Sequence, residues 1–310
     1  MGKVPAMWWR RSDGTLVKGL SNERRAMPYF MRGRNESAVY FEHDASIVKT
    51  DAFIREWNQT NPMLRIDVFH LAVWALRDGL ERTPSINRFV MGGRLYQRDG
   101  IWFSYAVKRK LETGAPLAVV KRRFDTDATF GEMVQGMAEK QAEITSQSGR
   151  LDAELGLLMK FPGFVRRIIM AAIRGLDRLG MLPKSYVEND PMYTTAFFAN
   201  MASFGMPAVY HHLYEYGTAN IFISVGRPTT DPGSPSSGPE RRRSMTLKYT
   251  FDERTEDGLT ALFVLRRIKQ ILEDPYATGL AVEALPAGAA PTLNGSAGGG
   301  LADEAAPVDS

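Results

Sequence analysis

The residues best suited to chemistry form an acidic corner, residues 252–258, which reads DERTEDG. It holds four carboxylates within six residues, and a carboxylate placed beside a reacting group can remove a proton as a general base. His211 and His212 are the other candidate bases, because an imidazole titrates close to neutral pH. These carboxylates and the two imidazoles are therefore the candidate groups for acid-base chemistry.

Two regular elements must hold this corner in place. The residues before it alternate between apolar and polar, as in a half-buried strand, and those after it repeat at helical spacing until Pro275 ends the helix. We therefore expect the corner where a strand at 245–252 turns into a helix at 259–272. The apolar positions are Met245, Leu247, Tyr249 and Phe251 in the strand, and Leu259, Leu262, Phe263, Ile268, Ile271 and Leu272 in the helix.

The corner resembles the D-H-R-x-x-D-G signature of the acyltransferase catalytic domain of 2-oxo acid dehydrogenase complexes, and the related H-x-x-x-D-G of chloramphenicol acetyltransferase. The likeness extends to the strand before it and to the helix, which ends in Leu-Glu-Asp-Pro. The resemblance makes Asp252, Arg254 and Gly258 structural members of the corner and places Asp257 in the catalytic site as part of its scaffold. One residue differs from the signature: Glu253 stands where the family has its catalytic histidine. Glu253 is therefore one candidate for the general base, and His211 and His212 are the others.

An arginine-rich segment, NERRAMPYFM at residues 22–31, resembles the R-x-x-I-A-x-x-M helix that opens the same domain. We expect Pro28 to lie in the first turn of this helix, where proline is tolerated. In the family, an arginine near this helix pairs with the aspartate of the corner. The resemblance therefore makes Arg24 or Arg25 the partner of Asp257, and the alternative is a solvated surface arginine.

A strand predicted within residues 193–205 is similar to the family's T-F-T-I-S-N-L-G strand, whose hydroxyl steadies the oxyanion of the tetrahedral intermediate. If Asn200 matches the family asparagine, the hydroxyl position is Ala199, which cannot donate a hydrogen bond. A shift of one residue would move every side chain to the other face of the strand. Thr195, Asn200 and Ser203 therefore stay open as substitutes.

His211 and His212 come just before a predicted strand at 220–227, which resembles the family's A-I-L-G-V-G-R. That strand is expected beside the active-site channel, so a histidine here could replace the missing base. The alternative is that both histidines hold an irregular loop through hydrogen bonds. His43 and His70 have no partner spacing and are expected to be ordinary buried or edge histidines.

Residues 151–189 form a helical insert that departs from the family pattern. Apolar residues recur at helical intervals with arginines among them, which predicts a basic amphipathic helix that a Pro-Gly pair interrupts and Pro183 ends. Such a helix can contact an anionic membrane or an acyl chain, here through residues 157–182. The plainer interpretation is a helix that covers the core or a subunit interface while its arginines reach solvent.

The remaining elements follow the order of the same family. The segment at 67–82 has one apolar face at helical spacing, and the turn after it is similar to the family's P-x-x-N. The other predicted elements are strands at 37–49, 88–95, 100–108 and 117–122 and helices at 51–58 and 129–145.

Composition bounds the class of protein. The chain has 310 residues, 44% of them hydrophobic and 24% charged, enough to bury a large core. It has no cysteine, which excludes disulfides and thiolate metal sites, and no histidine spacing that indicates a metal. The net charge of +4 is mild and the basic residues are dispersed, so we expect no nucleic-acid partner. No stretch reads as a signal peptide or a membrane span, which favours a cytoplasmic location.

The predicted organisation has three parts: an N-terminal arm at 1–20, an acyltransferase-like domain at 21–275 and a disordered tail at 276–310. The domain contains the helical insert and a loop at 228–242 that is rich in Pro, Gly and Ser and is expected to be mobile. The tail is rich in Ala, Gly and Pro and has no hydrophobic period.

The resemblance implies an α/β (α+β) fold like that of chloramphenicol acetyltransferase, a mixed sheet flanked by helices, assembled as a homotrimer or a higher assembly of trimers. Each active site would lie in a channel between two subunits. The implied activity is transfer of an acyl group from a CoA or carrier thioester to an unknown acceptor, with acyl-CoA or CoA as cosubstrate and no bound cofactor. No lipoyl domain is visible, so we expect a stand-alone protein. The alternative is a catalytically inactive trimeric scaffold, or a thioester-binding or regulatory protein, of the same fold.

Overall fold

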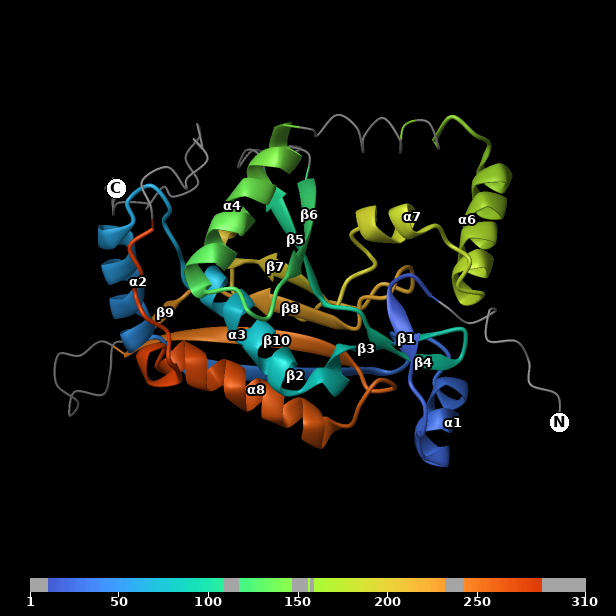
Figure 1. Ribbon diagram of the computed structural model, residues 1–310, viewed down its shortest axis with the longest axis horizontal. Helices are drawn as coiled ribbons and strands as arrows, with labels where there is room; N and C mark the ends of the chain where they lie inside the picture. Colours follow the sequence, from blue (N-terminus) through green and yellow to red (C-terminus); the bar gives the residue numbers. More distant parts are fainter. Residues whose placement is uncertain (1–10, 109–116, 147–155, 157–158, 232–241, 286–310) are drawn as a thin grey trace, which may run out of the picture.

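The computed structural model describes residues 11–108, 117–146, 156, 159–231 and 242–285, and arranges them around a large β-sheet (Figure 1). The strands lie in the order β2-β10-β8-β7-β5-β6, with β9 paired to β10. β7 runs parallel to both β5 and β8, and the other described pairs are antiparallel. The predicted mixed sheet is therefore confirmed. Its strands are β2 (Ala38–Ser46), β5 (Ile101–Lys108), β6 (Leu117–Phe124), β7 (Ala196–Asn200), β8 (Ile221–Val225), β9 (Thr229–Asp231) and β10 (Arg242–Asp252).

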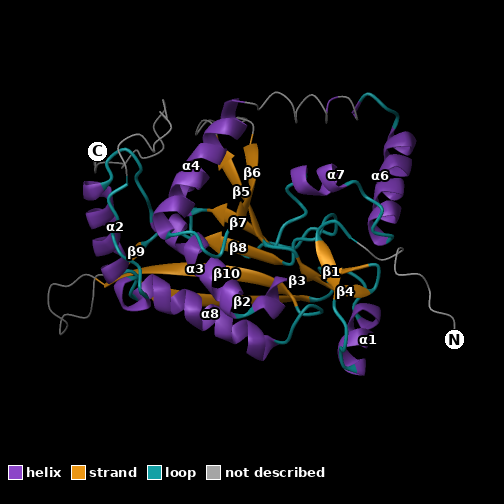
Figure 2. Ribbon diagram, viewed as in Figure 1, coloured by secondary structure: helices purple, strands orange, loops and turns teal. Residues whose placement is uncertain are grey.

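Helices pack against one face of this sheet and enclose the main core with it (Figure 2). α3 packs along α8, α8 also contacts β2, and α4 contacts β6. α3 begins where Asp67 accepts a hydrogen bond from the backbone N–H of Phe69, and His70 closes the same cap from the third helical position. The helices flanking the sheet, as predicted, are α2 (Val48–Thr60), α3 (Val68–Arg82), α4 (Phe130–Ser146) and α8 (Gly258–Glu273).

β10 has the alternation predicted for it. One set of its side chains lies in the main core beneath the helices, and the neighbours between them face the other side of the sheet. On that second face, a smaller cluster of aromatic and aliphatic side chains lies over β7 and β8. The main-core residues of β10 are Met245, Leu247, Tyr249 and Phe251, and the second cluster is formed by Phe197, Leu213 and Phe222.

The register of the sheet decides which side chains can meet near the corner. β10 pairs with β8, and Phe251 lies opposite Ile221. Four residues back along β10, Leu247 lies opposite Val225. β7 runs parallel to β8 and brings Asn200 level with Val225. At about 3.3 Å per residue, Asn200 therefore lies about 13 Å along the strands from the level of Phe251.

A second sheet has three strands in the order β1-β4-β3. The single strand predicted at 88–95 is wrong, because Gly92 and Gly93 form a tight turn with φ of 57° and 72° that divides it into β3 and β4. β1 lies within the predicted N-terminal arm and pairs with β4, so the described part of the arm belongs to the folded body. The strands are β1 (Gly14–Leu16), β3 (Arg88–Met91) and β4 (Arg94–Arg98).

Helix α1 (Asn22–Phe30) carries the arginines of the predicted opening helix. The side chain of Ser21 caps it by accepting a hydrogen bond from the backbone N–H of Arg24, at 3.3 Å. Pro28 lies in the last turn, so the prediction of a first-turn proline is wrong. A proline there removes one intrahelical hydrogen bond, and the helix tolerates the loss because it is short and its face is open to water.

The helical insert forms α6 (Gly163–Arg178) and the short α7 (Lys184–Asn189). α6 stands at the edge of the molecule, apart from the helices that cover the sheet (Figure 1). Asp177 is its one buried residue, so the interpretation of this helix as a cover for the core is wrong: its apolar stripe faces outward. No helix in the described part of the chain is both long and apolar enough to cross a bilayer.

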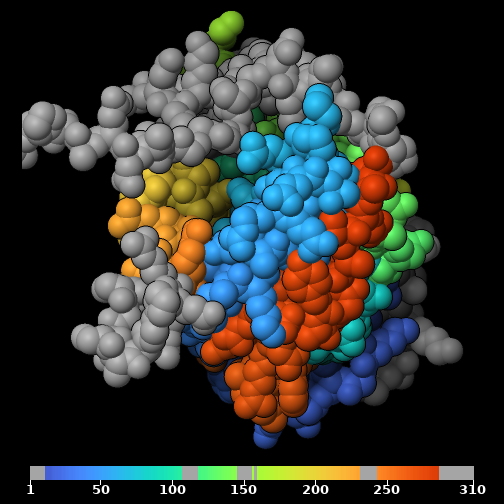
Figure 3. Space-filling model, turned by 90° about the vertical axis from the view of Figure 1, so that its left-hand side faces the viewer, coloured from blue at the N-terminus to red at the C-terminus, as the bar shows by residue number. Residues whose placement is uncertain are grey.

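The chain after α8 packs back onto the domain. Asn61 donates a hydrogen bond to the carbonyl of Glu283 at 2.8 Å, and its side-chain oxygen accepts one from the backbone N–H of Leu285 at 2.9 Å. Figure 3 shows this segment, in red, against α2, in light blue. The boundary predicted at residue 276 therefore lies inside the folded part. The predictions for residues 1–10, 151–155, 157–158, 232–241 and 286–310 fall outside the described residues.

His43 on β2 makes the stability of the fold depend on pH. Its ring stacks on Tyr249 with centroids 5.3 Å apart, and burial, with a contribution from Lys269, lowers the pKa of His43 from 6.5 to about 4. Between pH 6.5 and pH 4 the unfolded chain binds a proton that the folded chain does not. We expect this group alone to lower the free energy of unfolding by about 2–3 kcal/mol as the pH falls through that window.

His43→Phe keeps an aromatic ring on β2 and removes the titrating group. Urea unfolding at both ends of the window, for the wild type and for this variant, measures the difference in pH dependence. The same pH dependence in both proteins would contradict the assignment to His43.

Candidate active site

Asp252 is the buried centre of the acidic corner. It lies at the end of β10 with 0% of its surface exposed, and its two oxygens accept hydrogen bonds from Nε and Nη2 of Arg254 at 2.8 and 2.7 Å. The hydroxyl of Ser37 donates to the same carboxylate at 2.8 Å. A carboxylate enclosed in this way holds the corner together and cannot reach a substrate.

Two buried guanidinium groups lie near this carboxylate. Arg254 pairs with it directly, and Arg34 donates hydrogen bonds to the carbonyls of Tyr214 and Glu215 at 3.2 and 3.1 Å. Burial lowers the pKa of Arg34, and the negative charge of Asp252 opposes that effect. Asp252 therefore stabilises both cations, and Arg34 ties the corner to the loop before β8.

Glu256 and Asp257 are also paired with arginines. Nη1 of Arg88 lies 2.9 Å from Glu256, and Nη2 of Arg24 lies 3.4 Å from both Glu256 and Asp257. Asp257 caps α8 by accepting a hydrogen bond from the backbone N–H of Thr260 at 2.8 Å, and this bond lowers the pKa of its carboxyl. Both acids therefore fix the turn that begins α8.

Arg25 and Gly258, the other residues assigned to the corner, have no comparable part in it. Arg25 is an exposed residue of α1, whereas Arg24 lies within ion-pair distance of Asp257. Gly258 is the first residue of α8, and a Cβ built on it would meet no atom within 4 Å. Packing therefore does not demand a glycine at this position.

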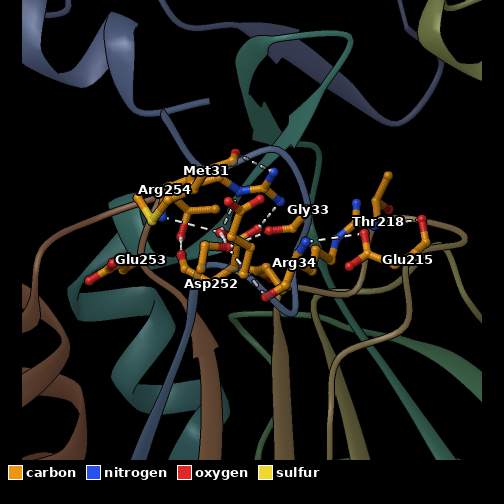
Figure 4. Close-up of polar contacts among 12 residues, drawn as sticks. Met31, Gly33, Arg34, Glu215, Thr218, Asp252, Glu253 and Arg254 are labelled. Carbon is orange, nitrogen blue, oxygen red and sulfur yellow. Dashed lines mark hydrogen bonds and ion pairs between the residues drawn. The ribbon is translucent and has the colours of Figure 1, made fainter. Parts of the chain in front are cut away.

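Glu253 is the one carboxylate of the corner that has no hydrogen-bond or ion-pair partner among the described residues. Its main chain is held on both sides: its N–H donates to the carbonyl of Ser37 at 3.1 Å, and its carbonyl accepts from Nη1 of Arg24 at 3.1 Å. Its side chain is half-buried and points away from the pair of Asp252 and Arg254 (Figure 4). The corner thus fixes the backbone of Glu253 and leaves its carboxylate free to accept a proton.

His211 and His212 lie in the loop before β8, on the second face of the sheet. His211 stacks on Phe222 with ring centroids 3.9 Å apart, and its carbonyl accepts a hydrogen bond from Thr250 of β10. Nδ1 of His211 lies 2.7 Å from the carbonyl of His212, and Nδ1 of His212 lies 3.0 Å from that of Leu213. A carbonyl only accepts, so each Nδ1 carries a proton and each neutral ring keeps a basic Nε2. Burial also lowers the pKa of His211.

The candidate oxyanion donors are largely engaged in structural bonds. The buried hydroxyl of Thr195 donates to the side chain of Asn87 at 2.7 Å, and that of Ser203 donates to the carbonyl of Asn200 at 2.7 Å. The side-chain oxygen of Asn200 accepts from the backbone N–H of Ser203 at 3.2 Å, which leaves its amide N–H groups as donors. Ala199 has no polar side-chain atom. Asn200 is therefore the usable donor of this set, and it lies at the far end of β7 from the corner.

Three residues that complete the corner were not predicted from the sequence: Ser37, Arg34 and Arg88. The signal for the first two is strand pairing, because β2 lies beside β10 with Ala38 opposite Asp252. Polar residues just before β2 must then lie at the corner. Nothing local to residues 252–258 identifies Arg88.

A metal does not fit this corner. Asp252, Glu256 and Asp257 are bonded to arginines, and among the described residues no group of three or more His, Asp or Glu side chains could hold a metal ion. The geometry instead offers an unpaired carboxylate on a rigid turn, which suits proton transfer.

Solved structures of acetyltransferase cores have the same architecture. A probable dihydrolipoamide acetyltransferase from Listeria monocytogenes 4b F2365 matches over 84% of this chain and 95% of its own, with 15% identity and a TM-score of 0.51. The cubic core of the pyruvate dehydrogenase multienzyme complex matches over 84% and 93%, with 14% identity and a TM-score of 0.54. A dihydrolipoamide acetyltransferase from Azotobacter vinelandii matches over the same shares, with 14% identity and a TM-score of 0.53.

This chain has the fold of an acetyltransferase core. No protein-family model matches it, and no curated protein matches it in sequence. On the acetyltransferase-core fold, the acidic corner lies between the last long strand of the sheet and the last long helix, β10 and α8. The fold predicted from the corner and its flanking elements is therefore confirmed.

Proposed function

We propose that this protein is an acyltransferase that moves an acyl group from a CoA or carrier thioester to an acceptor, with Glu253 as the general base. The observation that carries the proposal is the free carboxylate of Glu253, at the place of the catalytic histidine in the acyltransferase signature. Its main chain is held by Ser37 and Arg24, while its side chain has no hydrogen bond to any residue that the structure describes. Glu253 can therefore take and return a proton while the corner stays intact.

Residue spacing in a protein of the same fold supports this assignment. In the Azotobacter vinelandii acetyltransferase, a serine, a histidine and an asparagine were investigated for their role in the catalytic mechanism, and the histidine and asparagine are four positions apart. Glu253 and Asp257 have the same spacing here. Asp257 caps α8 and contacts Arg24, so it holds the turn that carries Glu253.

In the proposed reaction, Glu253 removes the proton from the acceptor as the acceptor's lone pair attacks the thioester carbonyl. The resulting tetrahedral oxyanion collapses by breaking the bond between carbon and sulfur. The thiolate leaves with that electron pair and takes up the proton from Glu253. An N–H donor directed at the oxyanion would stabilise it, a contribution typically of about 10²-fold or more in rate.

We assign that donor to Asn200 of a second copy of the chain. Within one copy, Asn200 lies about 13 Å along the strands from the level of the corner, too far to touch the same oxyanion as Glu253. A homotrimer in which the corner of one subunit meets the end of β7 in the next would bring the two together. The thioester and the acceptor would then enter between subunits.

The proposal predicts that Glu253→Gln lowers the rate of acyl transfer about 10²-fold or more, because glutamine keeps the size of the side chain and cannot take up a proton. The rate is measured as thiol release from a panel of acyl-CoA thioesters with oxygen, nitrogen and sulfur acceptors. Glu23→Gln changes an exposed glutamate of α1 and is the matched control, which should keep the wild-type rate.

His211→Gln tests the second base in the same assay. A loss of rate in this variant with no loss in Glu253→Gln would assign the proton transfer to the histidine and overturn the role of Glu253. Equal rates in the wild type and every variant, no higher than the rate without protein, would overturn acyl transfer altogether.

A catalytically inactive protein of this fold is the second candidate, and Ala199 favours it. Alanine at the hydroxyl position removes one oxyanion donor, and glutamate replaces histidine at the corner. Such a protein would bind a thioester, or serve as a trimeric scaffold or regulator, without turnover. Calorimetric binding of CoA by a wild-type protein that releases no thiol would support this candidate, and turnover that Glu253→Gln abolishes would exclude it.

A further inference from the structure

α6 presents an apolar stripe to the outside of the molecule. Phe164 and Ile168 are 65% and 63% exposed, values that belong to surface residues, although both side chains are strongly apolar. The stripe continues beyond the helix in both directions, so it is longer than α6 itself. Its exposed members are Met159, Phe161, Phe164, Ile168, Leu176, Leu179 and Met181.

Cations accompany this stripe. Arg167, Arg174 and Arg178 are all exposed, and their spacing of seven and four residues puts them on one side of the helix. The one acid of α6, Asp177, is buried and faces the body of the protein. The outward side of α6 therefore combines apolar surface with positive charge and has no negative charge of its own.

The inner side of α6 is fixed to the body. Asp177 accepts hydrogen bonds from Nη1 of Arg11 at 2.7 Å and from the hydroxyl of Tyr193 at 3.0 Å. At the end of the helix, a Cβ built on Gly92 would lie 2.6 Å from the carbonyl oxygen of Arg178, so the turn between β3 and β4 presses against it. These contacts hold the helix in one orientation, with its apolar stripe outward.

α1 adds two aromatic side chains on the other side of that turn. Tyr29 and Phe30 are 72% and 74% exposed, and a Cβ built on Gly93 would lie 3.4 Å from the hydroxyl oxygen of Tyr29. The turn at Gly92 and Gly93 therefore touches both helices, and Figure 1 has α1 and α6 at the same end of the molecule. Tyrosine favours the boundary between water and lipid, and phenylalanine can insert among the acyl chains.

We propose that α6, with Tyr29 and Phe30, is a docking surface for an anionic lipid bilayer. A helix with an exposed apolar stripe, arginines beside it and no exposed acid can lie in the plane of the bilayer, with its apolar side chains among the acyl chains and its cations at the headgroups. A second copy of the chain is a poorer partner for this surface, because a symmetric dimer would bring the arginines of two α6 helices together. The proposal is independent of acyl transfer and does not rest on it.

The test is co-sedimentation of the full-length protein with phosphatidylcholine vesicles, with and without phosphatidylserine. We expect binding to the vesicles that contain phosphatidylserine, and weaker binding as salt is raised. Changing Arg167→Gln and Arg174→Gln together should weaken binding about 25-fold, since each cation near the surface is worth about fivefold. Ile168→Asp should weaken it about tenfold or more, because an apolar contact is lost and a charge is repelled.

Arg55→Gln and Met63→Asp are the matched controls, since both residues are exposed and lie on or just after α2, at the opposite end of the molecule (Figure 1). Both should bind like the wild type. The proposal would be overturned if the double arginine variant and Ile168→Asp bound the vesicles as well as the wild type does. It would also be overturned by an Ile168→Asp protein that dissociates from oligomer to monomer in sedimentation velocity with no change in lipid binding, because the occupant would then be a second copy.

Discussion

Asp252→Asn is expected to lower the free energy of unfolding by about 3–5 kcal/mol, the loss typical when one partner of a buried ion pair is removed. Asp252 is fully buried, pairs directly with Arg254 and offsets the positive charge of Arg34. Asparagine fits the same space without a charge, and its N–H groups would face other donors. Arg254 then loses its paired carboxylate, and Arg34 loses the largest of the opposing negative charges and keeps that of Glu215. Urea unfolding followed by circular dichroism measures the change.

Asp257→Asn is the matched control in the same corner. The side chain of Asp257 is 55% exposed, and its ion pair with Arg24 is long, at 3.4 Å. Asparagine caps helices about as well as aspartate, so the expected loss is below about 0.5 kcal/mol. If both variants lost the same free energy of unfolding, the burial of Asp252 with Arg254 would not be what stabilises the corner.

A double variant separates the ion pair from the other contacts of Asp252. If the pair accounts for most of the loss, Asp252→Asn combined with Arg254→Gln should cost less than the sum of the single changes, with an interaction energy of about 1–3 kcal/mol. Strict additivity would assign the loss to Ser37 and Arg34 instead.

The elements around the corner could be predicted because their signals are local. The alternation in residues 245–252 and the helical spacing after it depend only on which side of each element is buried, and β10 and α8 follow them. The choice between Arg24 and Arg25 could not be made in this way. Both lie in one turn of α1, and only the direction of that helix relative to the corner brings Arg24 to Asp257.

The less predictable features depend on contacts between distant parts of the chain. The apolar stripe of α6 predicts that something packs against it. The sequence pattern alone does not show that the stripe faces away from the protein's own core. In the sequence, the acids of the corner are like charges placed close together. In the fold, Arg88 pairs with Glu256, and Arg254 and Ser37 enclose Asp252. The turn at Gly92-Gly93 is different, because two adjacent glycines are a local signal that the prediction of one strand overlooked.

Arg11→Met is expected to destabilise the fold by about 3–5 kcal/mol and to loosen α6 in particular. Nε and Nη2 of Arg11 bind both oxygens of Asp13 at 2.8 and 3.0 Å, and Nη1 binds Asp177 of α6 at 2.7 Å. The guanidinium also lies over the ring of Phe89, 5.2 Å from its centroid. Methionine fills a similar space and donates no hydrogen bond. Asp177 would therefore stay buried beside a side chain that cannot neutralise it, and Asp13 would keep, among the described residues, only Arg98, 4.0 Å away.

Hydrogen exchange followed by mass spectrometry distinguishes loss of the α6 anchor from general destabilisation. The amides of α6 should exchange much faster in Arg11→Met, because the contact of Asp177 with Arg11 joins the helix to the chain before β1. Arg32→Met is the matched control: its side chain is 88% exposed and lies 3.9 Å from Glu36, so the change should cost less than about 0.5 kcal/mol. If α6 exchanged at the wild-type rate while the whole protein lost stability, Tyr193 and the turn at Gly92 would be its true anchors. Arg11 would then stabilise only the sheet that contains β1.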